Sequence, residues 1–287
     1  MNKLSFLLIN DFFMKTKLIF VLFWVFININ FLKANTIPIT IGIAPHSSTR
    51  MILETHQDLK QFFENYFKRP VEILTAKNFS EFAKRSNEGT YYDLILTSPN
   101  LALLAQKLAS YTPIMTYKKG LSSIILSKDK YILKKENYPL HAIGLDPVSF
   151  ATLYAQDWLE KQGLKENKEI NYTYTSASDS SVAILLNNQA DLSIMSVPNY
   201  MKLSDEIKNK VFIIYQSEPK PSRIYLAKEN NGITLEEWKN ALKAFAESKE
   251  GKNHLEVTKL DDFKMIETSD LENLDGIVEK TFQRLNQ

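Results

Sequence analysis

The feature that most limits the fold of this chain is an alternation of short β-branched runs with longer helical periods. Residues 37–44 form a strand-like run, and from Met51 to Phe67 the apolar residues fall on one helical face. The same pattern predicts strands at 71–74, 94–97 and 112–116, with helices between them. Such alternation favours an α/β fold with mainly parallel sheets and helices on both faces.

The pattern then restarts, with expected strands at 122–126, 141–144, 170–175, 192–195 and 211–215. The tail after Glu218 holds too little strand to make a third domain, so we expect it to return to the first lobe. We therefore predict a signal peptide (1–34), a first lobe (35–118), a second lobe (119–215) and a returning segment with C-terminal helices (216–287). Two crossovers form a hinge, and the cleft between hinged lobes is a place where small ligands bind.

The N-terminal segment has the pattern of a secretory signal peptide. A basic stretch begins at Met14, residues 18–27 are apolar, and Leu32-Lys33-Ala34 offers a cleavage site. The apolar run is shorter than the roughly 20 residues that span a bilayer, so an uncleaved anchor is the weaker alternative. We expect export to the periplasm and a mature protein that begins near residue 35.

Charge and cysteine content exclude several classes of protein. The whole chain carries a formal charge of +2, residues 1–34 contribute +3 of it, and residues 35–287 therefore carry −1. A chain without net positive charge gives no electrostatic case for nucleic-acid binding. The absence of cysteine excludes disulfides, thiolate metal sites, a cysteine nucleophile and a lipid anchor on cysteine. We expect a free monomer without nucleic-acid partners.

Four loops at predicted strand-to-helix junctions carry hydroxyl side chains. Backbone N–H groups at helix starts and neutral hydroxyls both suit an anion, and the carboxyl ends of strands are the usual binding edge of an α/β sheet. For any single loop, a helix N-cap is the better explanation of the hydroxyl, and the occurrence of such loops in both lobes is what favours a binding site. The candidate ligand-binding residues are Ser47, Ser48, Thr49, Thr97, Ser98, Ser149, Phe150, Thr152, Ser178 and Ser196.

Motifs of catalysis and of cofactor binding are absent from the sequence. It has no Gly-x-Ser-x-Gly elbow, no Walker loop and no Gly-x-Gly-x-x-Gly run. The four histidines show no metal-ligand spacing, although His46 lies in a candidate loop where it could donate to an anion or be a solvated turn residue. We predict a binding protein without cofactor or metal, and not an enzyme.

Three segments resemble the phosphate, phosphite and phosphonate class of periplasmic binding proteins of ABC transporters. They are Tyr92 to Pro99 (a Tyr-Asp strand leading into a Ser-Pro turn), Asn187 to Leu192 (similar to Asn-Gly-x-Ala-Asp) and the proline-containing Ser217 to Ser222. The resemblance runs from about Ile39 to about His254. It implies a type 2 two-lobed fold, a small oxyanion as ligand and an inner-membrane ABC permease as partner.

One loop departs from that family. The family often follows Asp-Pro with Ser-Thr-Ser-Gly, whereas this chain has Asp146-Pro147 followed by Val148 and then Ser149-Phe150-Ala151-Thr152. Two of the expected hydroxyls are therefore missing, so the ligand's identity stays open. A ligand-sensing protein that presents a different small molecule to a membrane receptor is the alternative function.

Overall fold

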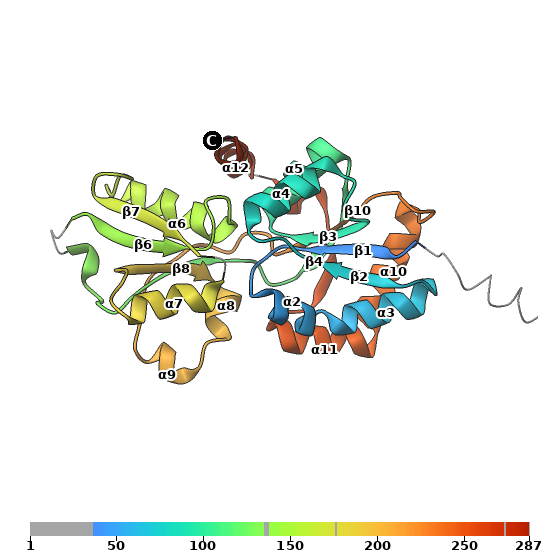
Figure 1. Cartoon of the computed structure of the whole chain (residues 1–287), viewed down its shortest axis with the longest axis horizontal. Helices are drawn as coiled ribbons and strands as arrows, with labels where there is room; N and C mark the ends of the chain where they lie inside the picture. Colours follow the sequence, from blue (N-terminus) through green and yellow to red (C-terminus); the bar gives the residue numbers. More distant parts are fainter. Residues whose placement is uncertain (1–36, 135–137, 176, 273, 287) are drawn as a thin grey trace, which may run out of the picture. The chain divides into compact units, whose positions relative to one another are not determined.

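Two β-sheets organise the chain, and each has helices packed against it (Figure 1). The computed structural model describes residues 37–134, 138–175, 177–272 and 274–286, so the predicted signal peptide lies outside the described residues. Residues 39–287 form one compact unit, and within it we call the half built on the six-stranded sheet the first lobe and the half built on the five-stranded sheet the second lobe.

The first lobe contains the sheet with strand order β11-β4-β10-β3-β1-β2. Its strands are β1 (Ile39–Ile43), β2 (Val71–Leu74), β3 (Leu94–Thr97), β4 (Thr112–Tyr117), β10 (Ile224–Ala227) and β11 (Phe263–Met265). Its helices are α2 (Thr49–Thr55), α3 (Gln57–Phe67), α4 (Phe79–Glu88), α5 (Pro99–Ala109), α10 (Leu235–Glu247) and α11 (Lys249–Thr258).

The second lobe contains the sheet with strand order β7-β6-β8-β5-β9. Its strands are β5 (Ser123–Ser127), β6 (Leu140–Gly144), β7 (Ile170–Tyr174), β8 (Leu192–Ser196) and β9 (Phe212–Gln216). Its helices are α6 (Phe150–Lys161), α7 (Ser178–Leu186), α8 (Val197–Met201) and α9 (Asp205–Lys208), and short 3₁₀ turns cover Ile132–Lys134 and Thr268–Leu271.

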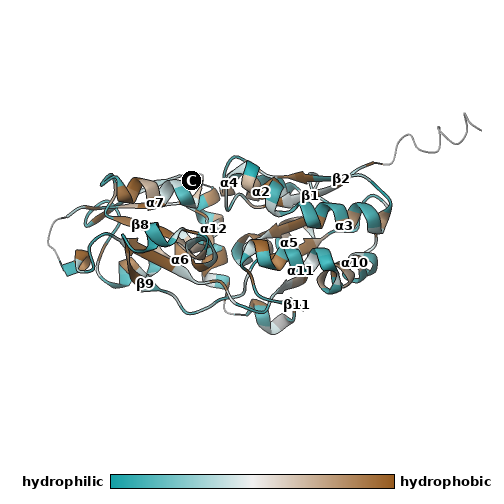
Figure 2. Ribbon diagram, turned by 90° about the horizontal axis from the view of Figure 1, so that it is seen from below, coloured by the Kyte–Doolittle hydropathy of each residue, from teal (hydrophilic) through white to brown (hydrophobic). Residues whose placement is uncertain are grey.

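Both faces of the first sheet are buried. Successive side chains of a strand point to opposite faces, and helices cover each face. In β3, Leu94 and Leu96 join the cluster under α3 and α10, whereas Ile95 joins the cluster under α4 and α5. Figure 2 shows hydrophobic residues along the strands. Burying each such side chain stabilises the fold by about 1.5–3 kcal/mol.

The α/β class and the two lobes are as predicted, but the expectation of mainly parallel sheets is wrong. Within the described residues, four strand pairs are parallel and five are antiparallel. The antiparallel pairs all involve β10, β4, β5 or β11, the strands next to the crossovers and in the returning segment. A strand that enters a sheet from the other lobe has no crossover helix to bring it back in the same direction. The sequence reading also missed β11.

The predicted single helix over residues 51–67 is two helices that meet at His56. His56 has φ −105° and ψ 16°, and both its backbone N–H and its ring Nδ1 lie within hydrogen-bond distance of the Ile52 carbonyl (3.1 and 2.8 Å). The ring is fully buried. The apolar periodicity continues through the bend, which is why the sequence did not reveal it.

The chain passes between the lobes at residues 118–122 and 217–223. These crossovers pair with each other: Leu121 N–H donates to Lys220 O (2.7 Å), and Lys220 N–H donates to Leu121 O (2.9 Å). The two connections therefore form a short antiparallel ribbon that joins the lobes.

The C-terminal helix α12 (Asp275–Leu285) contacts both lobes, packing against α5 and α6 (Figure 1). Lys280 pairs with Asp157 at 2.7 Å, and Arg284 pairs with Glu166 at 2.9 Å. Thr281, fully buried, accepts a hydrogen bond from Asn100 of the first lobe. The end of the chain thus forms a third link between the lobes.

Candidate functional site

A small cavity of about 40 Å³ lies where the two lobes meet, and both contribute to its wall. The first lobe supplies the ends of β1 and β3, the second lobe supplies the starts of α6 and α8, and the crossovers supply one residue each. We call it the inner cavity. Its lining residues are Ala44, His46, Phe79, Thr97, Ser98, Leu121, Leu145, Ser149, Phe150, Ala151, Ser196, Asn199 and Arg223.

Arg223, at the end of the second crossover, is the charged residue of this wall. It is 6% exposed, and its Nη1 has no hydrogen-bond partner among the described residues. No aspartate or glutamate belongs to the described lining of the cavity. Burial lowers the pKa of the guanidinium, which stays charged nonetheless because its ordinary pKa is so high. A buried cation without a carboxylate partner is costly, so its presence points to an anion that binds here.

Further basic groups surround Arg223. Burial, and then the charge of Arg223, hold the pKa of His46 well below its usual value. Lys202, which follows α8, has its pKa lowered to about 8 by burial and by Arg223 and Lys259. These groups depress one another because like charges disfavour further charging. The field in this part of the molecule is positive, and it favours a negatively charged ligand.

Behind His46, two more buried histidines continue into the first lobe. The ring centroids of His46 and His56 are 5.9 Å apart, and those of His56 and His254 are 5.2 Å apart. Burial lowers the pKa of His56 to about 4. His254 Nε2 lies 3.1 Å from the hydroxyl of Tyr117. The row therefore consists of neutral rings at physiological pH.

Five of the residues predicted as ligand contacts line the inner cavity: Thr97, Ser98, Ser149, Phe150 and Ser196. The Thr97 hydroxyl is buried and has no partner within the described residues. The hydroxyls of Ser98 and Ser149 each have an internal bond, the first to Asn100 Oδ1 (2.8 Å) and the second to Thr152 Oγ1 (2.6 Å). Ser149 also accepts from the Thr152 N–H as the N-cap of α6, which is the alternative role considered from the sequence.

The other predicted residues lie elsewhere. Thr152 is buried behind Ser149, and the hydroxyl of Ser178 lies 3.4 Å from the backbone carbonyl of His46. Ser47, Ser48 and Thr49 line a wider and more open cavity of about 830 Å³, which we call the outer basin. Its wall comes from both lobes and includes Lys77, Ser80, Asp146, Tyr174 and Asp179.

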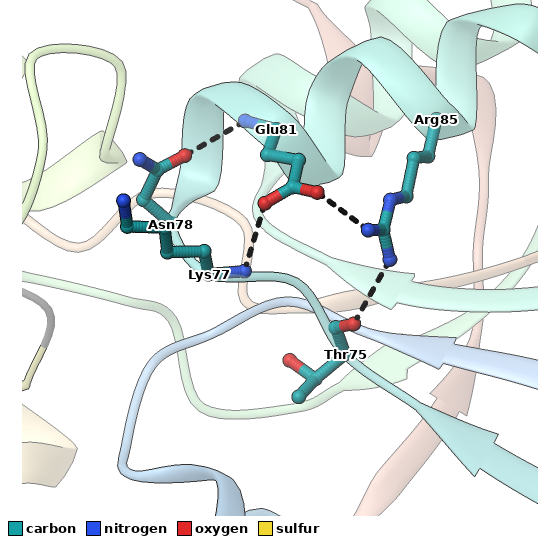
Figure 3. Close-up of polar contacts among 5 residues, drawn as sticks. All are labelled: Thr75, Lys77, Asn78, Glu81 and Arg85. Carbon is teal, nitrogen blue, oxygen red and sulfur yellow. Dashed lines mark hydrogen bonds and ion pairs between the residues drawn. The ribbon is translucent and has the colours of Figure 1, made fainter.

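The outer basin borders the loop before α4, which a local network holds in place (Figure 3). Asn78 Oδ1 accepts from the Glu81 N–H at 2.8 Å, and Glu81 accepts from the Lys77 N–H at 3.2 Å. Arg85 donates both to Glu81 and to the Thr75 carbonyl (3.3 Å). The loop is thereby fixed before Ser80, whose hydroxyl donates across the lobes to Asp146 at 3.1 Å.

Two polar residues of the described inner-cavity lining were missed from the sequence, Arg223 and Asn199. Arg223 is the last residue of the proline-containing crossover and precedes the fully buried strand β10, and a charged residue in such a position is a usable signal. Asn199 follows Pro198 after a strand, as Asn100 follows Pro99. His46, considered both as a donor and as a solvated residue, is buried at 6% exposure.

Comparison with known proteins gives the family. Residues 41–271 match the family model described as "ABC transporter, phosphonate, periplasmic substrate-binding protein". The chain belongs to this family. Its members are substrate-binding components of importers, so the chain is a binding protein and not an enzyme, as the sequence predicted. No curated protein matches it in sequence.

Solved structures agree with the family in fold. A binding protein component of an ABC phosphonate transporter from Pseudomonas aeruginosa aligns with a TM-score of 0.74 at 15% identity, over 87% of this chain and 88% of that one. PhnD1 from Prochlorococcus marinus, in complex with methylphosphonate, aligns with 0.72 at 12% identity, over 85% and 98%. A Xanthomonas citri protein bound to ATP aligns with 0.68 at 14% identity, over 88% and 98%. At such identities the likeness shows the two-lobed fold alone.

Family membership implies a periplasmic location and a permease partner. In the part of the chain that the structure describes, no helix is both long and apolar enough to cross a membrane.

Proposed function

We propose that this chain captures a small phosphorus oxyanion, a phosphonate, phosphite or phosphate-like ion, in the inner cavity and delivers it to an ABC permease. The lobes would close on the ligand, since residues of both line the cavity. Residues 1–34 would be removed on export, leaving a periplasmic monomer.

This proposal rests on the buried, unpartnered Nη1 of Arg223. Its unpartnered Nη1 and the absence of carboxylates from the described lining give the cavity one uncompensated positive charge. Charge-assisted hydrogen bonds from a guanidinium to an oxyanion are roughly twice as strong as neutral ones. The surrounding hydroxyls supply donors without adding charge.

Cavity size supports a small ligand. A water molecule needs about 10–15 Å³ of such space, so the inner cavity holds about three waters. That is the scale of a tetrahedral oxyanion. The outer basin, which shares Leu145 with the inner cavity, offers room for an organic substituent on the ligand.

The test is calorimetric titration of the purified protein with methylphosphonate, phosphite and phosphate. We expect at least one to bind, and Arg223→Gln to weaken it by at least tenfold, because bonds to charged groups contribute about 1.5–3 kcal/mol. Arg50→Gln is the matched control, since Arg50 is an exposed arginine paired with Glu54 on α2. If none of the three anions binds, or if Arg223→Gln binds as the wild type does, the proposal is wrong.

A further inference from the structure

Asn199 lines the inner cavity, and its side chain carries a buried hydrogen-bond acceptor. It is 5% exposed, and its Oδ1 has no partner among the described residues. Oxygen and nitrogen of an amide are assigned from their surroundings, so the orientation of this side chain needs a physical reason.

The backbone of His46 supplies that reason. Asn199 Nδ2 donates to the His46 carbonyl at 3.3 Å and also to the hydroxyl of Ser178. A carbonyl oxygen only accepts, so the amide nitrogen has to face it. The free atom of Asn199 is therefore the oxygen, a group that needs a donor.

His46 presents a second acceptor to the same cavity. Its Nδ1 lies 2.7 Å from the Ala44 carbonyl, which also only accepts, so Nδ1 carries the hydrogen. In the neutral ring, Nε2 is then a lone pair that can accept a hydrogen bond. The neutral form is favoured by burial and by the charge of Arg223.

The wall thus offers a cationic donor and two acceptors without hydrogens. A fully ionised tetrahedral anion has no hydrogen to donate. It could accept from Arg223, but its oxygen lone pairs would then face the lone pairs of Asn199 Oδ1 and His46 Nε2. An oxyanion with one protonated oxygen satisfies all three, because a P–OH group donates and the remaining oxygens accept. Leaving a buried acceptor unpaired costs about 1–3 kcal/mol.

We propose that the inner cavity selects oxyanions that carry a hydrogen on one oxygen, with Asn199 as the specificity-determining residue and His46 as the second acceptor. This inference rests on the proposed function, because it assumes that the anion binds beside Arg223. A fraction of a phosphorus oxyanion keeps such a hydrogen near neutral pH, because the second pKa of a phosphate ester is about 6. Sulfates and sulfonates do not.

Methylphosphonate and methanesulfonate make the test, because the hydrogen methylphosphonate ion and methanesulfonate have the same charge and nearly the same shape. They differ in the hydrogen that the methylphosphonate ion carries on one oxygen. At pH 6.5 we expect the wild type to bind methylphosphonate at least tenfold more tightly. In Asn199→Leu that ratio should fall below threefold, and Asn253→Leu, on the exposed face of α11, should keep it. A general loss of folding weakens both ligands and leaves the ratio unchanged.

A second measurement uses the wild type alone, so it does not depend on a variant that folds. We expect the ratio of the two affinities to fall as pH rises through the second ionisation of methylphosphonate. The basic and phenolic groups around the cavity are the same in both experiments, so their effects cancel in the ratio. These groups are His46, His56, His254, Lys202, Lys259, Arg223, Tyr117 and Tyr225.

The outcomes separate the two proposals. If both ions bind the wild type within threefold of each other, or if the ratio does not fall with pH, this inference is wrong and the proposed function stands. If neither ion, nor phosphite or phosphate, binds, the proposed function itself fails. A ratio that Asn199→Leu leaves unchanged in a folded protein removes Asn199 from the role assigned to it.

Discussion

Asn100 and Asn199 make reciprocal hydrogen bonds between the lobes. Asn100, in the first lobe, donates from Nδ2 to the carbonyl of Val148 in the second lobe at 3.0 Å. Asn199, in the second lobe, donates from Nδ2 to the carbonyl of His46 in the first lobe at 3.3 Å. Each asparagine follows a proline at the start of a helix, and each reaches the loop after an early strand of the other lobe. Two equivalent hydrogen bonds from asparagine side chains thus join the lobes.

Replacing Asn100 should weaken the closed form and the fold together. Its side chain also accepts from Ser98 Oγ and donates to Thr281 Oγ1 (2.8 Å each), so Asn100→Ala removes three bonds. We expect the free energy of unfolding to fall by about 1–3 kcal/mol, since the partners stay buried. Urea unfolding measures this, with Asn253→Ala as the exposed control. A loss no larger than that of the control would contradict it.

Arg223→Met should make the ligand-free protein more stable. The guanidinium is buried without a carboxylate among the described residues, so an apolar side chain of similar length removes a desolvation cost. We expect a gain of about 1–3 kcal/mol in ligand-free protein, measured by thermal or urea unfolding. The same variant should show no stabilisation by methylphosphonate. A variant less stable than the wild type without ligand would show that Arg223 is paired in the fold.

Gly144→Ala should displace Thr152, which lies behind Ser149 in the wall of the inner cavity. A Cβ at Gly144 would lie 2.8 Å from Thr152 Oγ1, whose partner is the Ser149 hydroxyl. Overpacking of this kind costs about 1–3 kcal/mol, and we also expect weaker ligand binding. Gly276→Ala is the control, because nothing lies within 4 Å of its added Cβ and the site is in α12. Alanine in place of that helical glycine should stabilise by about 0.5–1 kcal/mol. Equal effects of both changes on unfolding would refute the packing argument.

The buried histidines should make the protein lose stability in mild acid. The pKa of His56 is about 4 in the folded state and about 6.5 when unfolded, so between these values only the unfolded state binds the proton. Stability is therefore intact above pH 6.5 and is lost as pH falls toward 4, by about 1.4 kcal/mol per pH unit for this group. His56→Gln should reduce the slope by that amount. Unfolding curves at pH 4.5, 5.5, 6.5 and 8 measure it, and an unchanged slope below pH 6.5 would contradict the assignment.

Most of the strands and helices, the α/β class and the two lobes were predictable, because hydrophobic period and turn residues are local properties of the sequence. Four strand-to-helix loops were predictable for the same reason, and Thr97, Ser98, Ser149 and Phe150 on them line the inner cavity. Ser47 to Thr49 belong to an equivalent loop yet line the outer basin, since loop depth depends on packing between the lobes.

Arg223 and Asn199 were not predictable as site residues by the same reasoning. What distinguishes Arg223 is that the described lining of the cavity contains no carboxylate, and what distinguishes Asn199 is the backbone carbonyl it faces. Both are properties of the assembled structure. The direction of β10 and the bend at His56 likewise depend on contacts between residues far apart in the chain or buried in the lobe.

The position of Arg223 on the ribbon between the lobes has a consequence for how specificity can change. Arg223, the charged residue of the cavity wall, lies three residues after Lys220, which pairs with Leu121. The charge of the cavity and the connection between the lobes therefore depend on one stretch of backbone. Altering the helix-start hydroxyls can adjust the fit of a ligand. In the proposed function, changing the charge of the accepted ligand means substituting a residue at the end of the second crossover.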